Sequence, residues 1–181
     1  METVDVTRDV KSARLASGLK LPYVEQGDPS GVPVVFLHAY VDSWRSFERL
    51  LSRLPHAIHA FAVTQRGHGD ADRPDSGYGL EELAADVAAF MDAVALEEAV
   101  IVASSSAGYT AQRFALDHPE RTLGIVLIGA PWSLRDKPGF SRFSEAVFGL
   151  SDPIDPAFVR EFVESTLFRP VPPAFLEAMI G

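Results

Sequence analysis

The sequence contains no cysteine, which excludes disulfide bonds, thiolate nucleophiles and cysteine-based metal sites. It also lacks any apolar run near the ~18 residues that a membrane-spanning helix needs. The first ten residues, METVDVTRDV, lack the basic start and the apolar stretch of a signal peptide. Together these absences predict a cytoplasmic protein.

Positive charge is scarce. The chain has 16 lysines and arginines against 25 aspartates and glutamates, for a formal net charge of −9. A nucleic-acid-binding protein is expected to present a basic face, and adsorption to anionic membranes needs clusters of basic residues. The charge balance therefore argues against both kinds of partner.

The chain does have the composition of a globular protein, with 47% hydrophobic and 23% charged residues over 181 positions. Short, nearly continuous apolar runs predict strands that are buried on both faces of a parallel sheet. These runs cover residues 32–37, 57–63, 99–103 and 123–128. Ahead of them, residues 12–17 and 20–26 alternate as in an antiparallel hairpin that turns at Gly18.

Amphipathic patterns between the runs predict helices. They cover residues 44–54, 80–94 and 106–117, with Ser43 and Gly79 as N-caps of the first two and His118-Pro119 ending the third. Alternation of strands and helices predicts an α/β fold with right-handed crossovers and helices on both faces of a mostly parallel sheet.

The pattern changes after Pro131. Residues 132–181 contain no strand-like run and hold seven of the twelve phenylalanines. Asp155-Pro156 is typical of a helix start, because aspartate caps and proline suits the first helical position. We therefore predict a core at 1–131 and a smaller layer of short helices at 132–181.

Residues 102–108, VASSSAG, follow one predicted strand and open one predicted helix. A nucleophilic serine on such a sharp turn needs small residues two positions before and two after. Ser104 fails because Val102 is β-branched, whereas Ser105 and Ser106 both have small neighbours. Serines before a helix are also common N-caps, so local sequence leaves open both the choice of serine and its role.

Five segments stand out along the chain, in the order YVEQGDP, VVFLHAYVDSW, QRGHGDADRP, SSAGYTAQRFALDHPER and LGIVLIGA. Each segment is weak evidence when taken alone. In this order they resemble the α/β-hydrolase superfamily, in its cofactor-free serine-hydrolase branch of haloperoxidases and esterases, and the resemblance covers essentially the whole chain.

The resemblance implies that Ser105 is the nucleophile, counted back from the HPER of residues 118–121. It also implies an oxyanion hole formed by the backbone N–H groups of Tyr40 and Ser106, with neither cofactor nor metal. Residues 132–181 would then be part of a helical cap. Trp132, Phe140 and Phe143 of this cap would line the substrate pocket, or would pack within the cap itself.

The chain departs from the family pattern at four positions. Alanine replaces glycine at 39, 103 and 107, and it replaces serine at 71. If position 39 needs a positive φ, Ala39 would be strained there.

The base and the acid of a serine hydrolase are harder to find. The family order is nucleophile, acid, histidine, and His118 is the one histidine after Ser105. It lies at the far end of the predicted helix, roughly 20 Å away. The resemblance makes His38 and His68 structural, His56 and His59 fall on opposite strand faces, and Asp136 is a weak candidate acid. We therefore expect histidine and aspartate beyond residue 181.

The resemblance then implies a chain truncated within the cap, whose sheet lacks its last two strands. The open sheet edge would need cover from a second copy or from a complementing C-terminal chain.

The leading hypothesis is a hydrolase of an ester, a lactone or a related small apolar substrate. Serine at position 105 disfavours the epoxide hydrolases and haloalkane dehalogenases of the family, which use aspartate there. The alternative is a non-catalytic ligand- or partner-binding relative, or an inactive fragment. The alanines at 39, 103 and 107 fit this alternative.

Overall fold

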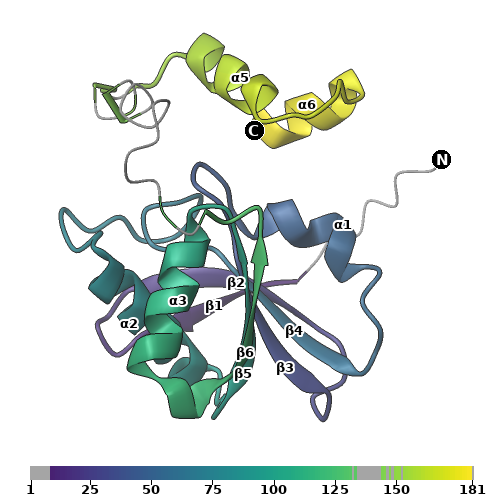
Figure 1. Ribbon diagram of the computed structural model, residues 1–181, viewed down its shortest axis with the longest axis vertical. Helices are drawn as coiled ribbons and strands as arrows, with labels where there is room; N and C mark the ends of the chain where they lie inside the picture. The colour runs from purple at the N-terminus through teal and green to yellow at the C-terminus, as the bar shows by residue number, and fades with distance from the viewer. Residues whose placement is uncertain are drawn as a thin grey trace. The chain divides into compact units, whose positions relative to one another are not determined.

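A computed structural model describes residues 9–131, 133, 144, 145, 147, 149–151 and 153–180. The chain forms two compact units, residues 1–132 and residues 133–181. Figure 1 shows the sheet and its flanking helices in the first unit, and each unit is described by itself below.

The first unit is built on a six-stranded sheet in the order β1-β2-β4-β3-β5-β6. β1 and β2 form an antiparallel hairpin, and β2 pairs antiparallel with β4. The remaining pairs are parallel. The predicted fold class is confirmed, including the antiparallel N-terminal hairpin and its turn at Gly18, which has φ +91°. The strands are β1 Val10–Arg14, β2 Lys20–Gln26, β3 Val32–Leu37, β4 Ile58–Val63, β5 Ala99–Ser104 and β6 Thr122–Ile128.

The sheet separates two buried hydrophobic clusters, and its central strand β3 contributes side chains to both. Successive side chains of a strand point to opposite faces of the sheet. Val35 and Leu37 pack into one buried cluster, whereas Val34 and Phe36 pack into the other. The continuous apolar run at 32–37 therefore serves both layers, as expected for a strand covered on both sides.

Two long helices cover one face, α2 Leu80–Ala93 and α3 Ala107–Asp117. Phe90 of α2 and Phe114 of α3 are fully buried in the cluster that contains Val35. Helical spacing in the sequence predicted both elements to within one residue at each end.

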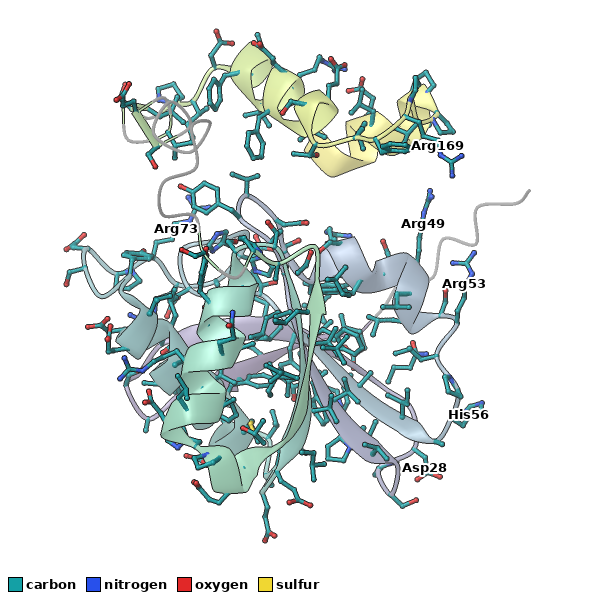
Figure 2. The ribbon with its side chains drawn as sticks, in the orientation of Figure 1. Asp28, Arg49, Arg53, His56, Arg73 and Arg169 are labelled. Carbon is teal, nitrogen blue, oxygen red and sulfur yellow. The ribbon has the colours of Figure 1, made fainter. Side chains whose placement is uncertain are left out.

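The other face is covered by a shorter element than predicted. A 3-10 turn at Trp44–Phe47 leads into α1 Glu48–Leu51, whereas the sequence predicted a helix to residue 54. Pro55 has no N–H to bond the carbonyl of Leu51, which accepts from the N–H of Leu54 in a tighter turn instead. Leu51 is buried, while Arg49 and Arg53 point away from the sheet (Figure 2).

β6 forms the open sheet edge that the resemblance implied, but it is not buried on both faces as its apolar pattern predicted. It pairs on one side with β5 and forms an edge of the sheet. Its apolar side chains are exposed, from 38% for Leu127 to 48% for Leu123 and Val126. The sequence pattern alone does not distinguish β6 from the central strands, because all of these runs are apolar.

The second unit contains two helices among its described residues 153–180. These are α5 Pro156–Ser165 and α6 Pro173–Ile180. The predicted start of α5 is confirmed, since the Asp155 carboxylate accepts a hydrogen bond from the N–H of Ala157 at 2.8 Å. Arg160 and Glu177 join the two helices by an ion pair at 2.8 Å. No helix in the described part of the chain is long and apolar enough to span a membrane.

Candidate active site

Ser105 occupies the turn between β5 and α3 in a strained conformation. Its φ is +48°, whereas Ser104 ends β5 and Ser106 has helical backbone at φ −57°. A left-handed conformation costs a residue other than glycine roughly 1–2 kcal/mol. The N–H of Ser105 donates to the carbonyl of Ile128 at 2.9 Å, which holds the turn against the end of β6. The Ser105 side chain is exposed.

Small residues surround this turn. Ala103 and Ala107 are buried, so a single methyl group fits at each of the two positions where the family pattern has glycine. Gly108 has no such room, because a Cβ atom there would lie 2.4 Å from the Cβ of Ala130. The start of α3 is therefore pressed against the segment that follows β6.

The loop that follows β3 is anchored by His38, which is fully buried. Its Nδ1 bonds to the carbonyl oxygen of Ala39 at 2.8 Å, and its Nε2 accepts from the N–H of Gln65 at 3.0 Å. This arrangement needs a neutral ring with its proton on Nδ1. Burial lowers the pKa of His38 to about 4. His38 therefore fixes the loop rather than acting as a base.

The loop then brings Tyr40 to the start of α3. The backbone N–H of Tyr40 donates to the Ser106 hydroxyl at 2.8 Å. The structure therefore brings together Ser105, Ser106 and Tyr40, the three residues predicted for the nucleophile and the oxyanion hole. Sequence reasoning missed the role of the Ser106 side chain. The available signal was a second hydroxyl directly after the predicted nucleophile.

Backbone strain in this loop lies at Val41, not at Ala39. Val41 has φ +58°, and Ala39 is not among the residues with positive φ. The conditional expectation of strain at position 39 is therefore not met. A β-branched residue in the left-handed region is rare and costly, and such strain is characteristic of functional sites.

None of the five histidines hydrogen-bonds the Ser105 hydroxyl in the described structure. His59 pairs with Glu25 at 2.7 Å, and His118 caps the far end of α3. His56 is exposed at the margin of the unit (Figure 2). The ring of His68 packs edge-on against the rings of His38 and Tyr40, at centroid distances of 4.9 and 6.2 Å.

Four residues considered from the sequence lie outside the described residues. They are the pocket candidates Trp132, Phe140 and Phe143 and the candidate acid Asp136. Among the residues that are described, no group of three or more histidine, aspartate or glutamate side chains could hold a metal ion.

The arrangement suits a reaction that develops negative charge beside Ser105. α3 is an eleven-residue helix, and its N-terminus favours nearby negative charge. The N–H of Ser106 lies at this end and has no acceptor among the described residues. The site therefore has an exposed hydroxyl next to an unused backbone donor.

Curated proteins similar in sequence to this chain include a chloroperoxidase and an epoxide hydrolase. A non-heme chloroperoxidase of Streptomyces lividans is 34% identical over 119 residues, which are 64% of this chain and 42% of that protein. Epoxide hydrolase B of Mycobacterium tuberculosis is 33% identical over 111 residues, which are 60% of this chain and 31% of that protein. The chain thus spans less than half the length of these curated relatives.

Solved structures with a similar fold include an esterase and a hydrolase. An esterase from Rhodococcus sp. ECU1013 superposes with a TM-score of 0.80 at 29% identity, over 95% of this chain and 67% of that one. A hydrolase from Pseudomonas aeruginosa gives 0.81 at 20% identity, over 95% and 65%. The family model for the alpha/beta hydrolase fold matches residues 32–168. The chain belongs to the alpha/beta hydrolase fold family.

Proposed function

We propose that the protein carrying this chain is a cofactor-free hydrolase that cleaves an ester, a lactone or a related small apolar substrate through Ser105. The observation that carries the proposal is the positive φ of Ser105 at the turn between β5 and α3. This is the strained strand-to-helix turn on which a nucleophilic serine of the fold sits. Neither Ser104 nor Ser106 has that conformation.

In the proposed reaction, the Ser105 oxygen attacks the carbonyl carbon of the substrate. A new C–O bond forms, the π electron pair moves to the carbonyl oxygen, and the Ser105 proton passes to a general base. Collapse of this intermediate expels the alcohol, which takes the proton from the base. Water then attacks the acyl-serine and gives a proton to the base. Collapse of this second intermediate releases the acid and expels the Ser105 oxygen, which takes the proton back from the base. The N–H of Ser106 is a proposed donor to the oxyanion, and the N–H of Tyr40 is proposed to contribute to the same oxyanion hole.

We place the general base and the acid that orients it in a part of the protein outside residues 1–181. Two observations support this assignment. None of the five histidines hydrogen-bonds the Ser105 hydroxyl in the described structure, and the chain spans only 42% of the chloroperoxidase that it resembles.

The proposed substrate class rests on serine at position 105. The relatives include proteins named chloroperoxidase, epoxide hydrolase and esterase. Epoxide hydrolases of the family use aspartate as the nucleophile, so a serine favours carbonyl substrates. It is also compatible with perhydrolysis on the same site.

The test is covalent labelling of the intact protein with a fluorophosphonate, followed by mass-spectrometric mapping of the adduct. We expect one adduct, on Ser105, which is lost in Ser105→Ala and kept in Ser104→Ala. A label on Ser106, or no label on a folded intact protein, would contradict the assignment of the nucleophile.

A second candidate is a non-catalytic protein that binds a ligand or a partner. It is supported by the Tyr40 N–H, which already donates to Ser106, and by the absence of a histidine bonded to Ser105 in the described residues. Turnover of p-nitrophenyl acetate by the intact protein, lost in Ser105→Ala, would exclude it. A folded protein with no turnover would support it.

A further inference from the structure

We infer that the Ser106 side chain is itself an oxyanion donor, with the Tyr40 N–H bonded behind it. The inference deepens the proposed function and rests on it. It replaces a direct contact between the Tyr40 N–H and the substrate by a relay in which Tyr40 donates to Ser106 and the Ser106 hydroxyl donates to the developing oxyanion.

The backbone N–H of Tyr40 already has an acceptor. It lies 2.8 Å from the Ser106 oxygen, within the normal range for a hydrogen bond. A backbone N–H has one proton to donate. In the described conformation it therefore cannot also bind a substrate oxygen at full strength.

The hydroxyl proton of Ser106 has no acceptor among the described residues. Ser106 is the residue before the first turn of α3, but its side chain makes no capping hydrogen bond. Its oxygen is engaged as an acceptor from Tyr40, and no bond donated by its O–H to another described residue is present. A hydroxyl is both donor and acceptor, so this one has a proton left to donate.

The hydrogen bond from Tyr40 polarises the Ser106 hydroxyl. An O–H group whose oxygen already accepts a hydrogen bond becomes a better donor, because hydrogen bonds in a chain strengthen one another. The backbone N–H of Ser106 belongs to the same residue as this hydroxyl, and it too has no acceptor among the described residues. Ser106 would therefore supply two donors to one oxyanion, its N–H and its O–H, directly beside Ser105.

Backbone strain lies on both sides of the hydrogen bond between Tyr40 and Ser106. Val41, next to Tyr40, has φ +58°, and Ser105, next to Ser106, has φ +48°. Each residue of the bonded pair thus has a strained neighbour. Strain of this kind persists where the surrounding structure holds a precise geometry.

The test compares wild type, Ser106→Ala and Ser106→Thr in the intact protein, with Ser104→Ala as the matched control and p-nitrophenyl acetate as substrate. Loss of one oxyanion donor typically lowers kcat by about 10²–10³-fold. We expect a loss of this size in Ser106→Ala with KM nearly unchanged, and recovery of at least about a tenth of the wild-type kcat in Ser106→Thr, which keeps the hydroxyl. Ser104→Ala should match wild type, and thermal unfolding reports whether each variant is folded.

A pair of ketone inhibitors separates a donor role from a structural one. A trifluoromethyl ketone forms an anionic adduct with a serine nucleophile, whereas the matching methyl ketone binds without charge. Ser106→Ala should weaken the first inhibitor by the same factor as kcat and leave the second unchanged. Equal weakening of both would overturn the donor role.

The outcomes distinguish this inference from the proposed function. If Ser106→Ala is as fast as wild type or faster, the hydroxyl merely covers the Tyr40 N–H, and the inference fails while Ser105 remains the nucleophile. If wild type shows no turnover and forms no ketone adduct at Ser105, the proposed function and the inference fail together.

Discussion

At the scale of single residues, buried His38 links stability to pH. Its ring is neutral, with both nitrogens hydrogen-bonded and none of its surface exposed. Burial, opposed by the hydrogen bond to the Ala39 carbonyl and aided slightly by nearby His68, lowers the pKa of His38 to about 4. The unfolded chain has the ordinary value near 6.5, so between pH 4 and 6.5 the unfolded state binds more protons and is favoured by acid.

We therefore expect His38 to contribute stability that is complete above pH 6.5 and lost as the pH falls toward 4. Lowering the pH from 7 to 5 should reduce the free energy of unfolding by about 2 kcal/mol through this residue. Urea unfolding at both values measures it. His38→Gln, which keeps one donor and one acceptor, should flatten the dependence, whereas His118→Gln should not. If the free energy of unfolding of His38→Gln depends on pH as strongly as that of wild type, other groups cause the effect.

Residue-scale features differ in how far the sequence predicts them. Small neighbours in the sequence narrow the turn serine to Ser105 or Ser106, and the choice of Ser105 comes from the family resemblance, counted back from the HPER segment. The bond between Tyr40 and Ser106 joins residues 66 positions apart. It depends on how closely the loop after β3 approaches α3, and no pattern within either segment encodes that approach.

At the scale of elements, an ion pair fastens the loop after β4 to α2. The guanidinium of Arg66 makes a two-pronged contact with the Asp86 carboxylate, with Nη2 and Oδ1 2.6 Å apart. Both residues are 8% exposed. α2 also carries an exposed ion pair, from Glu81 to Arg113 at 2.8 Å.

The two pairs should respond differently to removal of the carboxylate. Asp86→Ala leaves a buried arginine without its partner and should cost about 3–5 kcal/mol of unfolding free energy. Glu81→Ala removes a solvated pair on the same helix and should cost less than about 1 kcal/mol. Denaturant unfolding of both variants gives the comparison. Similar losses would mean that the Arg66 pair is solvated.

Helical periodicity predicted α2 but not the partner of its buried charged residue. Leu83, Val87 and Phe90 recur at helical spacing, and they predicted the element and its buried face. Asp86 lies on the same helix, and it is buried as well. A charged residue there needs a partner, but Arg66 is 20 residues earlier and the sequence pattern does not select it among the other basic residues.

At the scale of the whole molecule, the sheet has one hydrophobic edge. The alternation of strands and helices predicted an α/β sheet, but not the order of its strands, because order depends on which crossovers form. In the observed order β6 lies outermost. Such an edge can pair with another strand, and we propose that a second copy or a further segment of the protein covers it.

Val102 and Val126 give a direct measure of this edge. They are register partners on β5 and β6, yet Val102 is 7% exposed and Val126 is 48% exposed. In a protein of residues 1–181, Val102→Lys should cost at least about 3 kcal/mol by burying a charge, and Val126→Lys less than about 1 kcal/mol. Thermal unfolding measures both, and a large loss at Val126 would show that β6 is already covered.

The conformation of Ser105 has a consequence for directed evolution. Glycine adopts a positive φ without strain, so Ser105→Gly would relax the turn and remove the hydroxyl in a single codon change. Stabilising substitutions are common and easily enriched. A library ranked by heat resistance alone would therefore drift toward glycine at this position, and it would need a parallel screen for chemistry to retain the serine.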